Sequence, residues 1–105
     1  MQKKLAGIEK KIVLLKDELL KIGEMRPGSL TLQYQNRKEK KGGYYQISYT
    51  HKMKSRTEYV KPEFVEDLQK QIKNFKRFKK LTQMWIDLAI EYSKLKIELA
   101  KQPKD

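Results

Sequence analysis

The chain has 105 residues, of which 38% are hydrophobic and 36% are charged, and its formal net charge at pH 7 is +12. This length predicts a single domain, residues 1–105, and the lack of cysteine excludes disulfides, thiolate metal sites and thiol catalysis. The only histidine, His51, has no acidic cluster near it in the sequence, so we expect no catalytic triad, no metal site and no cofactor. The protein is therefore expected not to be an enzyme.

The first predicted element is a helix over residues 1–24. Its hydrophobic residues recur at alternating spacings of three and four, as on one face of an amphipathic helix; they are Leu5, Ile8, Ile12, Leu15, Leu19 and Ile22. Gly23 and Pro27 follow, and both residue types are typical of a helix end. The hydrophobic runs are too short for a signal peptide or a membrane span, so we expect a cytoplasmic protein.

Residues 30–60 are predicted to form a three-stranded antiparallel meander. Hydrophobic and polar residues alternate around Leu32 and Ile47, which is typical of strands with one covered and one open face. Residues 36–43 are expected to be a flexible connection, residues 51–54 a tight turn, and "RTEYV" the third strand. We expect the open face to carry Thr31, Gln33, Gln35, Tyr44, Gln46, Ser48, Thr50, Arg56 and Glu58.

The last predicted element is one long helix over residues 62–102, which begins at Pro62. Its first hydrophobic face is defined by Phe64, Leu68, Ile72 and Phe75, and a second face, rotated from the first, by Leu81, Trp85, Leu88, Tyr92, Leu95 and Leu99. The helix should change its packing partner near residues 76–80, resting on the sheet before them and pairing with the first helix after them. The expected fold class is α+β, with the N-terminal helix and the long C-terminal helix paired as an antiparallel hairpin.

Positive charge is concentrated in the middle of the chain. Residues 36–61 contain eight basic and two acidic residues, and residues 70–80 contain six basic residues and no acidic one. Lysine and arginine contact phosphates, and glutamine, serine and tyrosine can hydrogen-bond or stack on bases. The predicted nucleic-acid-binding residues are Arg37, Lys38, Lys40, Lys41, Tyr44, Gln46, Ser48, Lys52, Lys54, Arg56, Lys73 and Arg77.

Two functions remain open on these residues. The first is a nucleic-acid-binding module, with DNA as the expected partner, that uses the basic meander and its loops. The second is a protein-interaction or assembly module, a homodimer through the helices, in which the charges only keep the protein in solution. A basic helix face is more often simply solvated, and Tyr45, Tyr49, Tyr59, Phe64, Phe75 and Phe78 are expected mostly to point inward rather than to stack on bases. We expect no membrane partner and no small-molecule substrate.

Four segments carry a resemblance to a known family. "MRPGSL" at 25–30, "GGYYQISYT" at 42–50, "SRTEYV" at 55–60 and "IKNFKRFKKL" at 72–81 resemble a family of small uncharacterised bacterial and archaeal proteins often found near mobile elements. Members commonly carry cysteines in the loop before the tyrosine strand, where this chain has "QYQNRKEKK", so the resemblance implies no thiol or metal role here. A meander followed by a helix is also similar to the arm-binding domain of tyrosine recombinases, which by analogy implies a sheet in the major groove.

Overall fold

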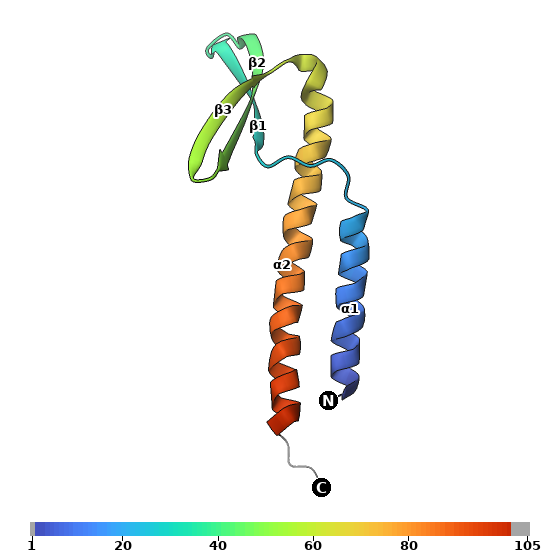
Figure 1. Cartoon of the computed structure of the whole chain (residues 1–105). Coiled ribbons are helices and arrows are strands. Elements are labelled where there is room, and N and C mark those ends of the chain that lie inside the picture. Colours follow the sequence, from blue (N-terminus) through green and yellow to red (C-terminus); the bar gives the residue numbers. More distant parts are fainter. Residues whose placement is uncertain (1, 102–105) are drawn as a thin grey trace. The chain divides into compact units, whose positions relative to one another are not determined.

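The computed structural model of the protein describes residues 2–101 (Figure 1). In chain order the elements are α1 (Gln2–Leu20), β1 (Ser29–Asn36), β2 (Lys41–His51), β3 (Lys54–Val60), a short 3₁₀ helix (Pro62–Phe64) and α2 (Val65–Lys101). This confirms the predicted α+β fold with an N-terminal helix, a three-stranded antiparallel sheet and a long C-terminal helix. The residues group into two compact units: a sheet unit, Gly23–Lys76, and a helical unit formed by the segments before and after it.

The helical unit is an antiparallel pair made by α1 and the C-terminal part of α2 (Figure 1). Within the described residues, its fully buried side chains are Ile8, Leu15 and Leu81. The remaining residues of both predicted hydrophobic seams are half-buried, and α1 contacts α2 along its length. The hairpin and both of its seams are therefore confirmed.

The first helix ends slightly earlier than expected. Instead of continuing to residue 24, α1 ends at Leu20. The amide of Lys21 donates to the carbonyl of Glu18 (3.2 Å), and the amide of Ile22 donates to that of Leu19 (3.1 Å). These bonds span three residues and tighten the last turn, which satisfies carbonyls that an α-helical end leaves without partners.

The sheet unit has the strand order β1-β2-β3, with both neighbouring pairs antiparallel. Its core is a cluster of Ile47, Val60 and Ile72, of which Ile47 is completely buried. Leu30 lies opposite Ile47 in the neighbouring strand, and Leu68 of α2 packs against the same cluster. The N-terminal part of α2 therefore covers one face of the sheet and leaves the other face open.

The two turns of the meander differ in length. Lys52 and Met53 form a two-residue turn with φ values of +51° and +66°, as in a type I′ hairpin, so the predicted tight turn is confirmed. The predicted flexible connection at 36–43 is wrong, because β1 extends to Asn36 and β2 begins at Lys41. The four residues between them form a turn in which the Asn36 Oδ1 atom accepts a hydrogen bond from the Glu39 amide (3.2 Å).

Candidate nucleic-acid interface

The face of the sheet opposite α2 presents only uncharged polar side chains. Because directly paired residues of antiparallel strands point to the same side, the register with β2 fixes which residues share this face. They carry hydroxyl, amide or phenol groups and are Ser29, Thr31, Gln33, Tyr44, Gln46, Ser48, Thr50, Ser55, Thr57 and Tyr59. We call this surface the open face.

Hydrogen bonds between neighbouring side chains order the open face. The hydroxyls of Ser48 and Thr57 are 3.2 Å apart, and those of Thr50 and Ser55 are 3.1 Å apart, so β2 and β3 are joined by a short hydroxyl ladder. A hydroxyl acts both as a donor and as an acceptor, so each member keeps hydrogen-bonding capacity for a ligand.

Two tyrosines form an aromatic pair on the open face. The ring centroids of Tyr44 and Tyr59 are 6.4 Å apart, with an interplanar angle of 34°. The prediction that Tyr44 points outward is confirmed, whereas the prediction that Tyr59 points inward is wrong, since Tyr59 is 65% exposed. Phe64, also predicted to lie inward, is 54% exposed in the 3₁₀ helix.

Cationic turns border the open face at both ends of β2. One turn carries Arg37, Lys38 and Lys40, the other carries Lys52, and all four side chains are exposed. Lys41 and Lys54 were also predicted to bind, but they begin β2 and β3, where pairing with Asn36 and His51 places both on the side of the sheet that α2 covers. Since β2 has 11 residues, the two turns are separated by about 33 Å of strand. The Nζ atom of Lys41 lies 3.5 Å from a carboxylate oxygen of Glu39, so this strand lysine is partly neutralised.

The third strand presents its charged residues on the other side of the sheet. Arg56 and Glu58 were predicted on the open face, but Arg56 pairs with Tyr49 and Glu58 with Ile47, so both lie on the face that α2 covers. The two-residue turn causes this outcome, because it sets His51 opposite Lys54 and thereby fixes the side of every later residue.

A local polar cluster surrounds the Glu58 carboxylate. It accepts a hydrogen bond from the Tyr49 hydroxyl (2.8 Å) and another from the Arg26 guanidinium (2.9 Å), which also lies 5.1 Å from the centroid of the Tyr49 ring. The hydrogen bond from Tyr49, and then that from Arg26, lower the pKa of Glu58 below its ordinary value. The cluster anchors the segment before β1 to the sheet.

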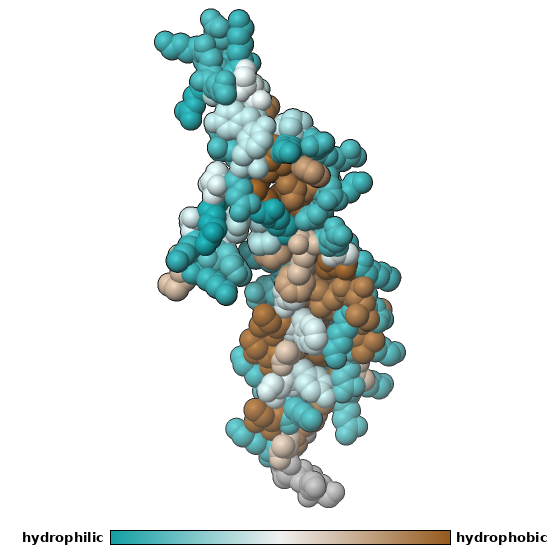
Figure 2. Space-filling view, turned by 45° about the horizontal axis from the view of Figure 1, so that its top comes forward, coloured by the Kyte–Doolittle hydropathy of each residue, from teal (hydrophilic) through white to brown (hydrophobic). Residues whose placement is uncertain are grey.

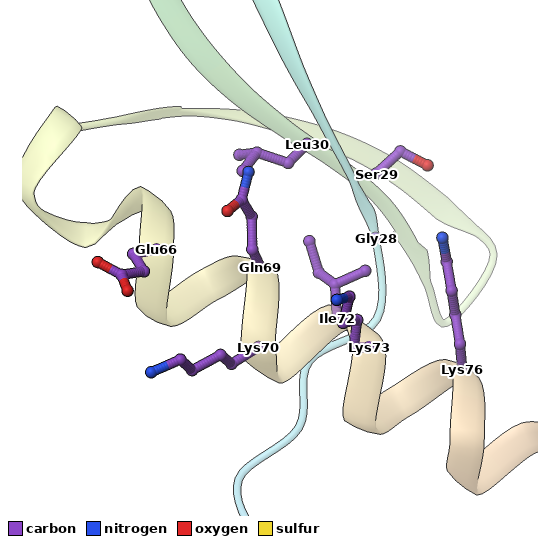
Figure 3. A pocket seen from close by; sticks show the side chains of 9 residues that line it. All are labelled: Gly28, Ser29, Leu30, Glu66, Gln69, Lys70, Ile72, Lys73 and Lys76. Atoms are coloured by element: carbon purple, nitrogen blue, oxygen red, sulfur yellow. The ribbon is translucent and has the colours of Figure 1, made fainter.

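A second basic surface lies between α2 and the start of β1. It is a groove of about 590 Å³ whose lining includes three lysines of α2, namely Lys70, Lys73 and Lys76. Figure 3 shows Lys76 rising from the helix beside Ser29, whereas Lys70 points away from the strand. This groove is on the helix-covered side of the sheet, so Lys73 does not share a surface with the open face.

Arg77 belongs to the helical unit, where its guanidinium contacts the Glu18 carboxylate. The pKa of Glu18 is lowered mainly by the charge of Lys21, and Arg77 contributes to the same shift. The structure therefore places Tyr44, Gln46 and Ser48 on one face between the cations of the two turns. The predicted binding residues Lys41, Lys54, Arg56 and Lys73 lie on the other side of the sheet unit, and Arg77 belongs to the helical unit.

Three residues of β3 lie on the open face although they were predicted neither to bind nor to lie there: Ser55, Thr57 and Tyr59. A signal for them exists in the sequence, since a two-residue turn at Lys52 and Met53 sets the register of β3 against β2. Counting residues from that turn places them opposite Thr50, Ser48 and Gln46, respectively.

Comparison with protein-family models, curated proteins and solved structures finds no match to this chain. The family resemblance of the four sequence segments therefore remains a prediction. In residues 2–101 no group of three or more histidine, aspartate or glutamate side chains is placed to hold a metal ion. No helix in the same range has the length and hydrophobicity to cross a membrane.

Proposed function

We propose that the protein is a non-enzymatic module that binds duplex nucleic acid, in the first place DNA, through the open face of its sheet. The observation that carries this proposal is an uncharged hydroxyl and amide surface with a cationic turn at each end. In this arrangement the open face contacts base edges, and the turns contact phosphates.

The dimensions of the sheet suit the major groove. Three strands spaced by about 4.8 Å span about 10 Å, and the major groove of B-DNA is about 12 Å wide. The two turns are separated by about 33 Å of strand, close to the roughly 34 Å length of one helical turn. A sheet lying along the groove thus places both turns at the backbone.

The chemistry of the open face supports base contacts rather than a general attraction to phosphate. Glutamine pairs with adenine through two hydrogen bonds, and serine and threonine can donate to or accept from either kind of base. The hydroxyls of Ser48 and Thr57, together with the Gln46 amide, give the centre of the face donors and acceptors without a competing charge. Removing such contacts weakens binding to a preferred sequence more than to other sequences.

A salt titration with matched charge reversals tests the proposal. The protein is added to a fluorescently labelled duplex of about 20 base pairs at several salt concentrations, and log Kd is plotted against log salt. Each phosphate contact contributes about 0.9 to the magnitude of the slope on B-DNA. Lys38→Glu and Lys52→Glu should each reduce the slope by about this amount. Lys73→Glu has the same change in net charge but lies in the α2 groove, so its slope should stay at the wild-type value.

Three results would overturn the proposal. The first is no detectable binding to duplex at low salt, and the second is a slope that changes for Lys73→Glu but not for the two turn variants. Preferential binding to a single strand of the same sequence would also reject duplex recognition, and it would assign Tyr44 and Tyr59 to base stacking instead.

A further inference from the structure

The helical unit buries few side chains for its size. In the described residues only Ile8, Leu15 and Leu81 of this unit are fully buried. Figure 2 shows hydrophobic side chains on the visible surface of the paired helices. The large hydrophobic residues of the unit that are at least 44% exposed are Val13, Leu14, Leu20, Met84, Ile86, Ile90 and Ile97. Two helices of this kind have too small a core to be stable without a further covering surface.

The hairpin of α1 and α2 has two sides along the line where the helices meet, and we call them its flanks. Side-chain contacts between the helices cover one flank but not the other. On one flank the Lys16 ammonium lies 5.1 Å from the centroid of the Trp85 ring, and the Tyr92 hydroxyl donates to Glu9 (2.7 Å). Leu14 is two residues before Lys16, so at about 100° per residue it points about 160° away from Lys16 around α1. The covered flank and the Leu14 flank are therefore different sides of the hairpin.

The Leu14 flank is an open hydrophobic groove. It has a volume of about 470 Å³ and is lined by Leu14, Leu15, Met84 and Leu88, with Lys11 of α1 and Asp87 of α2 as its charged residues. The two charges are opposite in sign and come from different helices. A surface that carries both signs in this way can be complementary to a copy of itself.

We propose that a second copy of the chain covers this groove, so that two hairpins form an antiparallel four-helix bundle. A two-fold axis parallel to the helices sets α1 of each copy opposite α2 of the other, which makes every neighbouring pair antiparallel. It also sets Lys11 of each copy opposite Asp87 of the other copy. A two-fold axis perpendicular to the helices would instead set Lys11 opposite Lys11, so the charges favour the parallel axis.

The surface area of the Leu14 flank predicts a weak dimer. The first helix has 19 residues, so the flank is about 28 Å long and, with two helices of about 10 Å diameter, about 20 Å wide. Two such flanks bury roughly 1,100 Å², which is at the lower end of specific protein interfaces. The dimer should therefore form in the micromolar range and depend on protein concentration. This inference does not depend on the proposed nucleic-acid binding.

Analytical ultracentrifugation of the full chain tests the interface. Wild-type protein is measured from about 1 μM to about 500 μM, a range that brackets a micromolar Kd. Leu14→Glu places a charge in the groove and should raise the dimer Kd at least about tenfold. The matched control is Ile90→Glu, since Ile90 is 51% exposed and points about 180° from Leu81, away from α1. Its Kd should stay within about twofold of wild type.

Far-UV circular dichroism of both variants establishes that the helices are intact, as expected for replacements of exposed side chains. Wild-type protein that remains monomeric at the highest concentration would overturn the inference. A dimer that survives Leu14→Glu but is lost in Ile90→Glu would overturn it as well, because the interface would then be the opposite face of α2.

A charge swap tests the orientation of the two copies. Lys11→Asp alone and Asp87→Lys alone each oppose like charges across the interface and should raise the dimer Kd about threefold or more. The double variant restores opposite charges and should return the Kd close to the wild-type value. Additive weakening in the double variant would reject the proposed two-fold axis.

Discussion

Replacement of Met53 by glycine should stabilise the sheet unit. Met53 has a φ of +66° in the two-residue turn between β2 and β3. Left-handed backbone conformations place the Cβ atom of an L-residue too close to the carbonyl oxygen, whereas glycine adopts them without this cost. Met53 is also 98% exposed, so its side chain makes almost no packing contribution that glycine would lose.

The magnitude follows from two opposing terms. The left-handed conformation costs a residue other than glycine about 1–2 kcal/mol. Glycine loses more conformational freedom on folding, which returns about 0.4–1 kcal/mol of that gain. The expected net effect is a stabilisation of about 0.5–1 kcal/mol, equivalent to a two- to fivefold slower amide exchange through unfolding of the hairpin.

The measurement is native-state amide hydrogen exchange of the β2–β3 hairpin, resolved by nuclear magnetic resonance. Fluorescence of Trp85, the only tryptophan, reports separately on the helical unit and should give an unchanged unfolding curve. The control is Lys54→Gly in the same hairpin, where φ is negative. There glycine should destabilise the strand by about 0.5–1 kcal/mol. Faster exchange in Met53→Gly would refute the assignment of strain to this turn.

Three further predictions concern the sheet unit. Ile47→Ala removes the fully buried core side chain and should destabilise the unit by about 3 kcal/mol, measured by urea denaturation. Gly28→Ala places a Cβ 3.0 Å from both an Ile47 side-chain carbon and the Ser48 carbonyl oxygen at a φ of +140°, so the midpoint of thermal unfolding should fall, whereas an unchanged midpoint would contradict this contact. The lowered pKa of Glu58 means that its carboxylate stabilises the fold above its ordinary pKa of 4.5, and that this contribution is lost as pH falls through the folded-state pKa. Glu58→Gln should therefore weaken the acid dependence of stability below about pH 4.5, and an identical acid profile in the variant would exclude this role.

The helical elements could be predicted from the sequence because their hydrophobic spacing is regular. The seam from Leu5 to Ile22 has one period throughout, so both the helix and its contact face follow from it. The change of face after Phe75 likewise predicts that α2 serves two packing partners, and the boundary between the two units lies at Lys76.

The faces of β3 could not be read from alternation alone. In β3 only Val60 is buried, and the charged Glu58 lies on the covered side, where Tyr49 and Arg26 satisfy its carboxylate. A strand at the edge of a small sheet buries too little for hydrophobicity to mark its inner face. Tyr59 looked like a core residue by type, but the register set by the turn places it on the open face.

The arrangement of the cations around the candidate site could not be predicted by counting charges along the sequence. Residues close in sequence, such as Lys41 and Lys52, lie at opposite ends of β2, and the region between them is polar without being charged. Charge density along the chain predicts an attraction to polyanions, but only strand length and register show how the cations are distributed around a surface.

The most direct measurement of the central claim is a nuclear magnetic resonance titration of the protein with a short DNA duplex, followed at side-chain amide signals. We predict that the side-chain amides of Gln33 and Gln46, on the open face, shift or broaden on addition of duplex. The amides of Gln71 and Asn74, which are hydrogen-bonded on the α2 side of the sheet unit, should remain unchanged. Shifts confined to Gln71 and Asn74, or no shifts at low salt, would contradict duplex binding by the open face.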